Sequence, residues 1–512
     1  MRLRFLTVLT ILFIILWSTS CRKDFEYAPS NGHLSFSKDT VYLDTVFSNI
    51  GSSTYTLKVY NDTKDDIIIP TITLKKGDKS FYRLNVDGVA GKEFENIPLY
   101  AKDSLFILVE TTIEINDNTL NELLYTDAIQ FDSEPYQQLV ELVTLAKDAI
   151  FLFPDVASEN SNQPVVLYNN ESGTPIEVKG FKLKEEELNF TNAKSYVIYG
   201  YAIVPQEKEL VIDAGARIHF HQNSGILVQD GAQISINGQL SENGDLLEGE
   251  VIFEGDRLEP EFAEIPGQWG AIWISAGSQN NTINHLTLKN AELGIFVEGK
   301  PNTTEKSLTI SNSRVFNSSR YNLWARNASI DATNLILGAS GNSSLLIENG
   351  GSYSFTHATI ANYWNKGFRF NAALEIYNSR KNASEDGFDL TKAEFKNCII
   401  DGNSSTEILL QSNNQNSFNF SFQNSFIKFN EATINDNLLY NFDNEMLFST
   451  IILDGNIDYY LPFENDFRIG LESEVINKGD VNTANSVPFD ILGEPRLPNP
   501  DLGAFQAKEK EM

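Results

Sequence analysis

The sequence predicts an all-β protein in which a parallel β-helix follows a small antiparallel β-sandwich. Three observations lead to this prediction. One eight-residue pattern recurs six times between residues 286 and 427. Before about residue 150 the chain instead shows short alternating strands separated by turns. Finally, 512 residues are too many for one ordinary domain, and a hydrophobic share of 41% is enough to fill an extended core.

The repeated pattern reads apolar-x-apolar-x-Asn-x-x-apolar. Its copies start 22, 22, 23, 40 and 27 residues apart, at Leu286, Leu308, Ile330, Tyr353, Ala393 and Phe420. A period of this length is typical of stacked units, none of which can bury its apolar face alone. The first four positions alternate as in a strand, and β-branched residues, Asn and Gly are frequent, which favours a β-helix over a helical solenoid.

The fifth position of the pattern is expected at a bend between two strands. Asn tolerates left-handed backbone and hydrogen-bonds locally, so it suits such a bend. Stacked coils would then place equivalent residues about 4.8 Å apart, in one column of amides. The predicted column consists of Asn290, Asn312, Asn334, His357, Asn397 and Asn424, in which His357 replaces an Asn.

The first twenty residues are expected to form a targeting segment. Two Arg residues precede an apolar stretch that ends in small residues before Cys21. This pattern resembles a bacterial lipoprotein signal, which implies that residues 1–20 are removed, that Cys21 is lipidated and that residues 21–31 form a tether. An uncleaved membrane anchor is the alternative. The resemblance implies an outer-membrane or cell-surface protein whose membrane contact is its lipid.

Residues 32–149 are predicted to form the sandwich, with turns at NIGSS, NDTKDD and KKGDK. The stretch from Asp44 to Ser53, followed by TLKVYNDTKDDIIIPTITL, resembles immunoglobulin-like domains of the Hydin type. Such domains are mostly spacers or binding modules. Residues 150–195 are expected to connect the two parts and to cap the first coil, because an open strand edge invites aggregation.

Residues 196–465 are assigned to the β-helix and residues 466–512 to a closing segment. The stretch KELVIDAGARIHFHQNSGILVQDGAQISINGQL resembles the first coils of pectin-lyase-like proteins, which are right-handed parallel β-helices. The stretches DFRIGLESEVINKGD and FDILGEPRLPNPDLGAFQ resemble the closing segment of secreted β-helix proteins. The resemblance implies the fold and a closed end, and does not imply an activity.

The charge balance argues against nucleic acid as a partner. The chain has 39 basic and 69 acidic residues, a formal net charge of −30, and no basic stripe. Such acidity is compatible with calcium, but no ligand set in the sequence supports a metal or any other cofactor.

A polar cluster is the first candidate site. Arg217, His219 and His221 alternate with Ile218 and Phe220, so they point to one face of a strand. They could form a metal pair or a base beside a cation. A polar outer face is the preferred interpretation, because no third ligand is evident.

Aromatic residues give a second candidate. Tyr321, Trp324, Tyr363 and Trp364 lie in or beside successive coils. Facing outward they would form a platform on which sugar rings stack, whereas facing inward they would fill the interior.

The sequence favours a non-catalytic role. The expected function is binding of a polysaccharide or a surface protein, or a structural scaffold. The alternative is a polysaccharide lyase or glycoside hydrolase, since the pectin-lyase-like superfamily contains such enzymes. Against it, the galacturonase phrases N-T-D, D-D and H-G are absent from the solenoid, and no two neighbouring coils carry paired Asp at matching positions.

Overall fold

The computed structural model describes residues 27–115, 120–154, 164–169, 175–244, 246–300, 305–381, 383–430 and 437–510. The predicted targeting segment, Cys21 and most of the tether therefore lie outside the described residues. The chain divides into two compact units, residues 1–148 and 149–512. Among the described residues, no helix is long and apolar enough to cross a membrane.

The first unit is a β-sandwich of two mainly antiparallel sheets. One sheet has the order β1 (Ala28–Pro29), β5 (Ile67–Leu74), β10 (Glu122–Phe131), β11 (Gln138–Lys147), β3 (Thr40–Phe47), with β8 (Glu93–Leu99) beside β5. The other has the order β2 (Leu34–Phe36), β4 (Tyr55–Asn61), β9 (Ser104–Thr111), β6 (Tyr82–Val86), β7 (Val89–Gly91). A short 3-10 turn, η1 (Gly77–Lys79), follows β5.

The sandwich forms because its strands alternate apolar and polar residues. In β4, for example, Leu57 and Val59 are buried between the sheets while Lys58 faces solvent. The predicted all-β architecture, a sandwich followed by a right-handed parallel β-helix, is confirmed.

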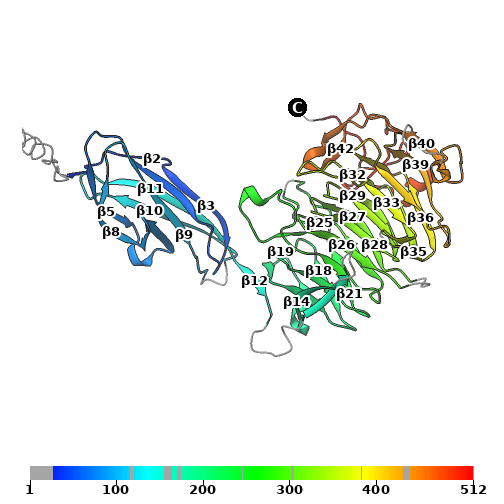
Figure 1. Ribbon diagram of the computed structural model, residues 1–512, viewed down its shortest axis with the longest axis horizontal. Coiled ribbons are helices and arrows are strands. Elements are labelled where there is room, and N and C mark those ends of the chain that lie inside the picture. Colours follow the sequence, from blue (N-terminus) through cyan, green and yellow to red (C-terminus); the bar gives the residue numbers. More distant parts are fainter. Residues whose placement is uncertain are drawn as a thin grey trace, which may run out of the picture. The chain divides into compact units, whose positions relative to one another are not determined.

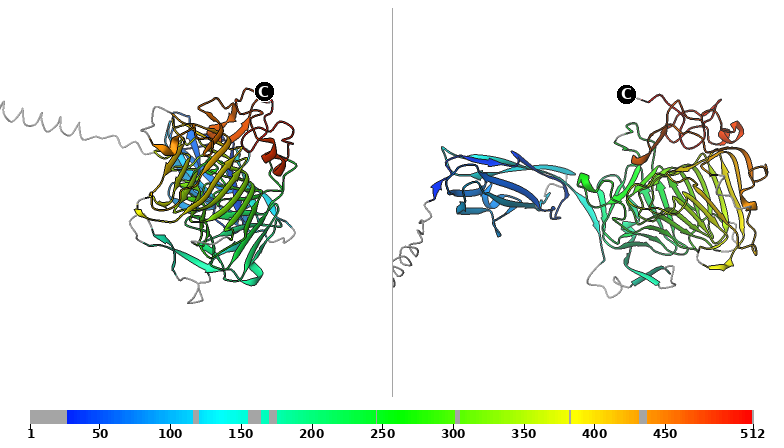
Figure 2. Two further views of the ribbon diagram at one scale, coloured as in Figure 1. Left: turned by 90° about the vertical axis from the view of Figure 1, so that its right-hand side faces the viewer. Right: turned by 45° about the horizontal axis from the view of Figure 1, so that its top comes forward.

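The second unit is the β-helix, whose coils have three faces (Figures 1 and 2). Face A consists of β15 (Asn189–Phe190), β18 (Glu209–Asp213), β21 (Gln233–Asn237), β24 (Asn281–Asn284), the first halves of β27 (Leu308–Phe316), β29 (Ser329–Leu337) and β39 (Ser421–Ile427), β31 (Gly351–Thr356) and β36 (Leu390–Lys396). Face B consists of β12 (Ala149–Leu152), β16 (Ser195–Ile198), β19 (Arg217–Phe220), β22 (Val251–Gly255), β25 (Leu286–Lys289), the second halves of β27, β29 and β39, β32 (Thr359–Asn362) and β37 (Ile399–Gly402); β40 (Phe448–Leu453) pairs along β39.

Face C is a separate ten-stranded sheet. It begins with the antiparallel hairpin β13 (Pro164–Asn169) and β14 (Pro175–Lys182) and continues through parallel strands β17 (Tyr201–Val204), β20 (Gly225–Val228), β23 (Ile272–Ile274), β26 (Leu293–Glu298), β28 (Tyr321–Arg326), β30 (Leu345–Glu348), β33 (Leu374–Tyr377) and β38 (Ile408–Gln411). The remaining short elements are η2 (Glu185–Glu187), η3 (Pro260–Phe262), β34 (Ser379–Arg380) with β35 (Ala383–Gly387), η5 (Leu438–Tyr440), β41 (Tyr459–Leu461) with β42 (Asp466–Ile469), η6 (Pro462–Glu464) and α2 (Val481–Ser486).

The interior of the β-helix is filled by side chains stacked from coil to coil. The rings of Phe355, Phe395, Phe422 and Phe448 stack in one column, with centroid separations of 5.0, 4.7 and 5.7 Å and nearly parallel planes. Parallel in-register strands place identical positions above one another, so a repeated Phe stacks on itself.

The corner between faces A and B carries an amide column. Asn312, Asn334, His357, Asn397 and Asn424 all have left-handed backbone, with φ between 44° and 54°. Asn334 Nδ2 donates to Asn312 Oδ1 at 2.9 Å, and Asn397 Nδ2 lies 3.0 Å from His357 Nε2. Amides with both a donor and an acceptor can link successive coils in this way.

The prediction for Asn290 is wrong, because this residue lies at the corner between faces B and C. It receives a hydrogen bond from Asn317 of the next coil at 2.6 Å. The register of β25 on β27 instead places His285, with φ 46°, at the A–B corner below Asn312. Each coil repeats a strand–bend–strand phrase at both corners, so the sequence pattern alone did not distinguish them.

His357 makes the stability of the β-helix pH-dependent. Burial lowers its pKa well below the ordinary value of 6.5. The folded chain therefore stays unprotonated here while the unfolded chain takes up a proton below pH 6.5, so the contribution of His357 is complete above that pH and declines below it.

We expect His357→Asn, which restores the amide of the column, to remove this component. Relative to the parent, the variant should gain up to about 1.4 kcal/mol of unfolding free energy per pH unit below pH 6.5. Denaturant titrations of both proteins between neutral and mildly acidic pH measure the difference. An unchanged difference across this range would contradict a neutral buried His357.

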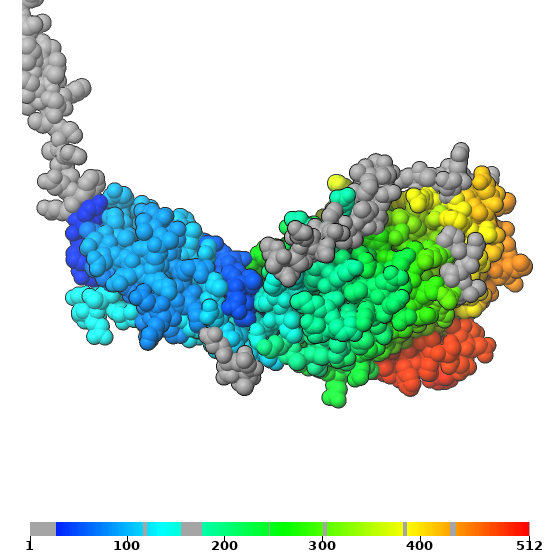
Figure 3. Space-filling view, turned by 90° about the horizontal axis from the view of Figure 1, so that it is seen from below, coloured from blue at the N-terminus to red at the C-terminus, as the bar shows by residue number. Residues whose placement is uncertain are grey.

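The closing segment packs along the side of the β-helix, at the A–B corner. Arg496 Nη2 donates to Asn334 Oδ1 at 2.8 Å, and Gly503 N donates to the carbonyl of Asn397 at 2.8 Å. Figure 3 shows the last residues, in red, against the yellow and green coils. The segment thus satisfies polar groups of the column that neighbouring coils leave available. The last coil itself is covered by aromatic residues such as Tyr440 and Phe442, which stack on or near Phe429.

Candidate functional site

The predicted polar cluster does not converge on one point. The Arg217 guanidinium donates to the carbonyls of Glu250 and Leu247, both at 2.7 Å. His219 is buried, with Nδ1 3.3 Å from the carbonyl of Gly255. The His221 ring pairs instead with Asp256, at 2.7 Å.

Each group of this cluster is therefore engaged within the protein, where His219 also lies 3.6 Å from the Glu254 carboxylate, and the arrangement braces the coils of face B. No group of three or more metal-ligating side chains occurs among the residues that the structure describes.

The predicted aromatic platform is not a single exposed surface. Tyr321 and Trp324 point outward from face C but are only 5% and 7% exposed, and Trp364 is 9% exposed. Tyr363 lies elsewhere, where its ring packs against Tyr459 of β41 and Phe467 of the closing segment, and its hydroxyl donates to an Asp401 oxygen at 2.8 Å. The expectation of a four-residue platform is therefore wrong: two residues join one apolar cluster and Tyr363 packs under the closing segment.

The outer side of face C carries an apolar column that sequence reasoning missed. The register stacks Ile203, Leu227, Trp273, Phe296, Trp324, Leu346, Glu375 and Leu409 on one another. The rings of Trp273 and Phe296 are 4.9 Å apart, and those of Phe296 and Trp324 are 4.4 Å apart. The sequence does contain a signal for this column: the segments AIWI, IFV and LLI are apolar at consecutive positions, which indicates burial on both sides of a strand.

One half of this outer surface is closed by ion pairs. Arg326 lies over the Trp324 ring at 4.6 Å and pairs with Glu298 at 3.1 Å and with Glu348 at 3.2 Å. Trp324 Nε1 also donates to Glu348 at 3.0 Å. Burial raises the pKa of Glu298 despite the adjacent Arg326. These carboxylates are engaged by the protein itself, which leaves little capacity for acid–base chemistry on a substrate.

A buried carboxylate in the next coil of face C is likewise engaged by protein groups. Glu375 accepts hydrogen bonds from Lys381 Nζ at 2.6 Å, from Asn371 Nδ2 at 2.8 Å and from the Tyr377 hydroxyl at 3.2 Å. Burial raises the pKa of Tyr377, and the nearby Glu375 charge raises it further. The Lys381 ammonium group therefore neutralises this buried carboxylate, and the neutral phenol of Tyr377 adds a hydrogen bond.

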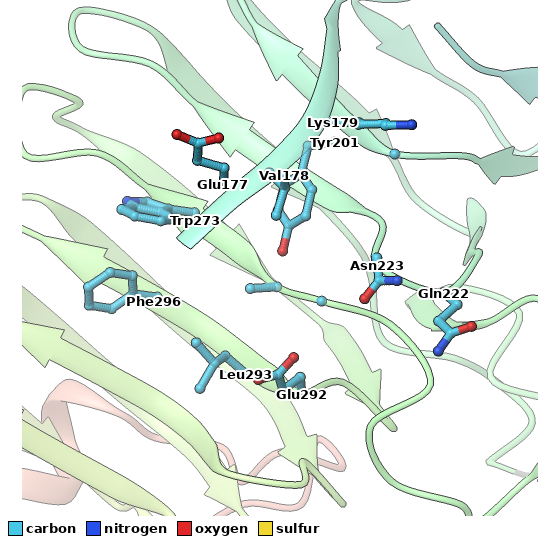
Figure 4. Close-up of a pocket in the computed structure, with 13 residues that line it drawn as sticks. Glu177, Val178, Lys179, Tyr201, Gln222, Asn223, Trp273, Glu292, Leu293 and Phe296 are labelled. Atoms are coloured by element: carbon cyan, nitrogen blue, oxygen red, sulfur yellow. The ribbon is translucent and has the colours of Figure 1, made fainter. Parts of the chain in front are cut away.

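The other half of the outer surface is a groove of about 550 Å³. Its apolar part is formed by Val178 on β14 and, from the following coils of face C, by Tyr201, Ala271, Trp273, Leu293 and Phe296. Figure 4 shows Tyr201 and Trp273 close to Val178 and Glu177 of β14. The polar lining is contributed by Glu177, Lys179, Gln222, Asn223 and Glu292.

Two glycines make the floor of the groove possible. A side chain at Gly270 would lie 2.1 Å from the Tyr201 hydroxyl oxygen, and one at Gly225 would lie 2.7 Å from the Tyr201 ring. The Tyr201 ring therefore lies directly on the backbone of the next two coils. These residues set the depth of the groove, and the resemblance to opening coils of β-helix proteins gave no indication of it.

The polar rim is formed by turns and by β14. Asn223 occupies the left-handed region, with φ 58°, in the turn between β19 and β20. Glu292 lies in the turn before β26, where its backbone N–H donates to the carbonyl of Trp269 at 2.6 Å. Its carboxylate lies 3.6 Å from Arg320. The groove thus combines aromatic and aliphatic walls with exposed carboxylate, amide and ammonium groups.

Comparisons with known proteins were made for the whole chain. No protein-family model and no curated protein matches it. Among solved structures, the catalytic domain of Agl-KA aligns at 13% identity over 74% of this chain and 80% of that chain, with a TM-score of 0.19. The catalytic unit of a GH87 alpha-1,3-glucanase from Streptomyces thermodiastaticus aligns at 10% identity over 72% and 83%, with a TM-score of 0.22.

A PapD-like domain of human CEP192 aligns at 9% identity over 26% of this chain and 95% of that chain, with a TM-score of 0.16. At these scores the similarities carry no conclusion about activity.

Proposed function

We propose that this chain is a lipid-anchored surface protein whose β-helix binds a neutral saccharide chain in the groove on face C without cleaving it. The observation that carries the proposal is the groove itself, which distinguishes Tyr201 and Trp273 from the equally buried Tyr321 and Trp324: they line a cavity beside exposed polar groups on β14 and the adjoining turns. The proposed anchor is a lipid on Cys21, and the first twenty residues are the signal that directs its attachment and is then removed.

The groove matches the chemistry of a sugar ring. A pyranose has C–H faces that pack on aromatic rings and hydroxyl groups at its edge, which hydrogen-bond to carboxylates and amides. Its volume of about 550 Å³ falls within the usual range for small-ligand sites. Two carboxylates and one ammonium group line it, so we expect neutral sugars to bind more tightly than uronic acids.

A glycoside hydrolase is the second candidate, because Glu177 and Glu292 both line the groove. Hydrolysis needs two carboxylates flanking the scissile bond, one of them as general acid. Both side chains are solvent-exposed, whereas a general acid at neutral pH is usually desolvated. We therefore favour binding without hydrolysis.

The test is retention and cleavage of a panel of neutral and acidic oligosaccharides. We expect Trp273→Ala to weaken retention of the bound sugar at least about tenfold, since it removes an aromatic wall. Trp324→Ala is the matched control, because it removes a similarly buried Trp of the same column that does not line the groove. Equal retention by the parent and Trp273→Ala would overturn the assignment of the groove.

Cleavage is followed in the same panel by reducing-end and unsaturated products. The binding proposal predicts none. Products formed by the parent and lost in both Glu177→Gln and Glu292→Gln would establish the hydrolase alternative instead.

A further inference from the structure

A loop on the β-helix presents two aromatic rings to solvent. It comprises residues 363–373 and joins β32 to β33. Phe368 and Phe370 are 93% and 94% exposed, the highest values among the large hydrophobic side chains that the structure describes. Two large apolar side chains exposed two residues apart in one loop point to an interaction site more than a single exposed residue does.

The residue between the two rings is anchored in the protein. The Arg369 side chain is 2% exposed and forms a two-pronged ion pair with Glu407, with N–O distances of 2.6 and 2.8 Å. Arg369 also donates to the carbonyls of Asn362 and Asn371. Because Arg369 is buried and its two neighbours are exposed, the rings of Phe368 and Phe370 project away from the protein. The ion pair of Arg369 with Glu407 fixes the backbone that carries the two rings.

We propose that Phe368 and Phe370 form a membrane-insertion tip that enters the interfacial layer of a lipid bilayer. Apolar side chains of interfacial segments, Phe among them, are buried at the boundary between headgroups and acyl chains, where they leave water. Arg369 is neutralised by Glu407, and the exposed Lys366, the remaining charge of the loop, can stay at headgroup level. The preformed loop loses little conformational entropy on insertion.

A bilayer fits this tip better than a protein partner does. Stable protein interfaces bury about 800 Å² on each side, whereas the loop offers two rings with the polar or small neighbours Asn365, Gly367 and Asn371. A single lipid chain binds membranes only marginally, so a second weak contact on a chain tethered through Cys21 would be strengthened by effective concentration. Insertion is independent of what the groove binds.

The first experiment is vesicle co-sedimentation of residues 21–512 carrying Cys21→Ser, which has no lipid. We expect measurable binding to phosphatidylcholine vesicles and no gain on adding phosphatidylglycerol, because residues 21–512, without Arg2 and Arg4, carry a formal net charge of −32. The double variant Phe368→Ser/Phe370→Ser should have a vesicle affinity at least about tenfold lower. It should fold normally, since the rings contact almost nothing in the protein. Phe489→Ser, at a 56% exposed Phe of the closing segment, is the control and should bind like the parent.

A second experiment locates the tip directly. Cys398 is buried, so Phe370→Cys in the same background provides one accessible thiol for an environment-sensitive fluorophore. We expect a blue shift on adding vesicles for this label and none for a label at Phe489→Cys. Absence of vesicle binding by the parent, or binding unchanged in the double serine variant, would overturn the proposal. Loss of saccharide retention in the double serine variant would also overturn the membrane proposal, because it would show that the two rings bind a glycan.

Discussion

Replacing Glu407 with alanine is expected to destabilise the β-helix by about 3–5 kcal/mol. Glu407 is fully buried and accepts four hydrogen bonds, two from Arg369 and one each from the backbone N–H groups of Ala373 and Ser404. Its removal leaves the Arg369 guanidinium buried without its counterion and two N–H groups without an acceptor. Urea unfolding monitored by tryptophan fluorescence measures the change.

The double variant Arg369→Leu/Glu407→Leu provides the control for this prediction. It removes both charges, so it should recover much of the loss, because a buried ion pair is often replaceable by apolar side chains. A single Glu407→Ala variant as stable as the parent would show that the pair is solvated, in conflict with its burial.

Replacing Phe395 with alanine should destabilise the same unit by about 3–5 kcal/mol. Phe395 is fully buried between Phe355 and Phe422, with nearly parallel rings on both sides. Truncation opens a cavity in the middle of the stack, where neighbouring coils cannot collapse without breaking backbone hydrogen bonds. Thermal and urea unfolding both report this loss.

Phe395→Leu is the graded control, because it keeps most of the apolar volume. We expect it to lose clearly less stability than Phe395→Ala. If both variants unfold at the same temperature and urea concentration as the parent, the rings do not form the continuous interior column described above.

The sequence predicted the architecture because a solenoid repeats its local rules. The recurrent phrase at Leu308, Ile330, Tyr353, Ala393 and Phe420 corresponds to strands of faces A and B in consecutive coils. It misplaced Asn290, since both corners accept an Asn in left-handed backbone. Such an ambiguity is resolved only by strand register, which long-range pairing sets.

The 40-residue gap between two copies was also only partly interpretable. Its length indicates one coil with a long excursion, and the polar stretch from Asn371 to Thr391 is the candidate for it in the sequence. The structure instead has a loop of residues 363–373, then β33 in face C, then the hairpin β34–β35. The strand LEIY is short and lacks the Asn phrase, so it was not separable from the polar sequence around it.

The candidate site was the least predictable part. Trp324 was a candidate for an exposed platform if it faced outward, and it is covered because Arg326 and Glu348 close over its ring. The groove depends on Tyr201, Gly225 and Trp273, which lie on three successive coils and share no motif. Their proximity is a product of coil stacking, which a linear pattern does not show.

The most direct test of the central claim is a crystal structure with a bound neutral oligosaccharide chosen from the retention panel. The proposal predicts sugar rings packed against Tyr201 and Trp273, with hydroxyl groups in contact with Glu177 or Glu292 and every glycosidic bond intact. An intact ligand located elsewhere on the β-helix, with this groove filled only by water, would contradict it.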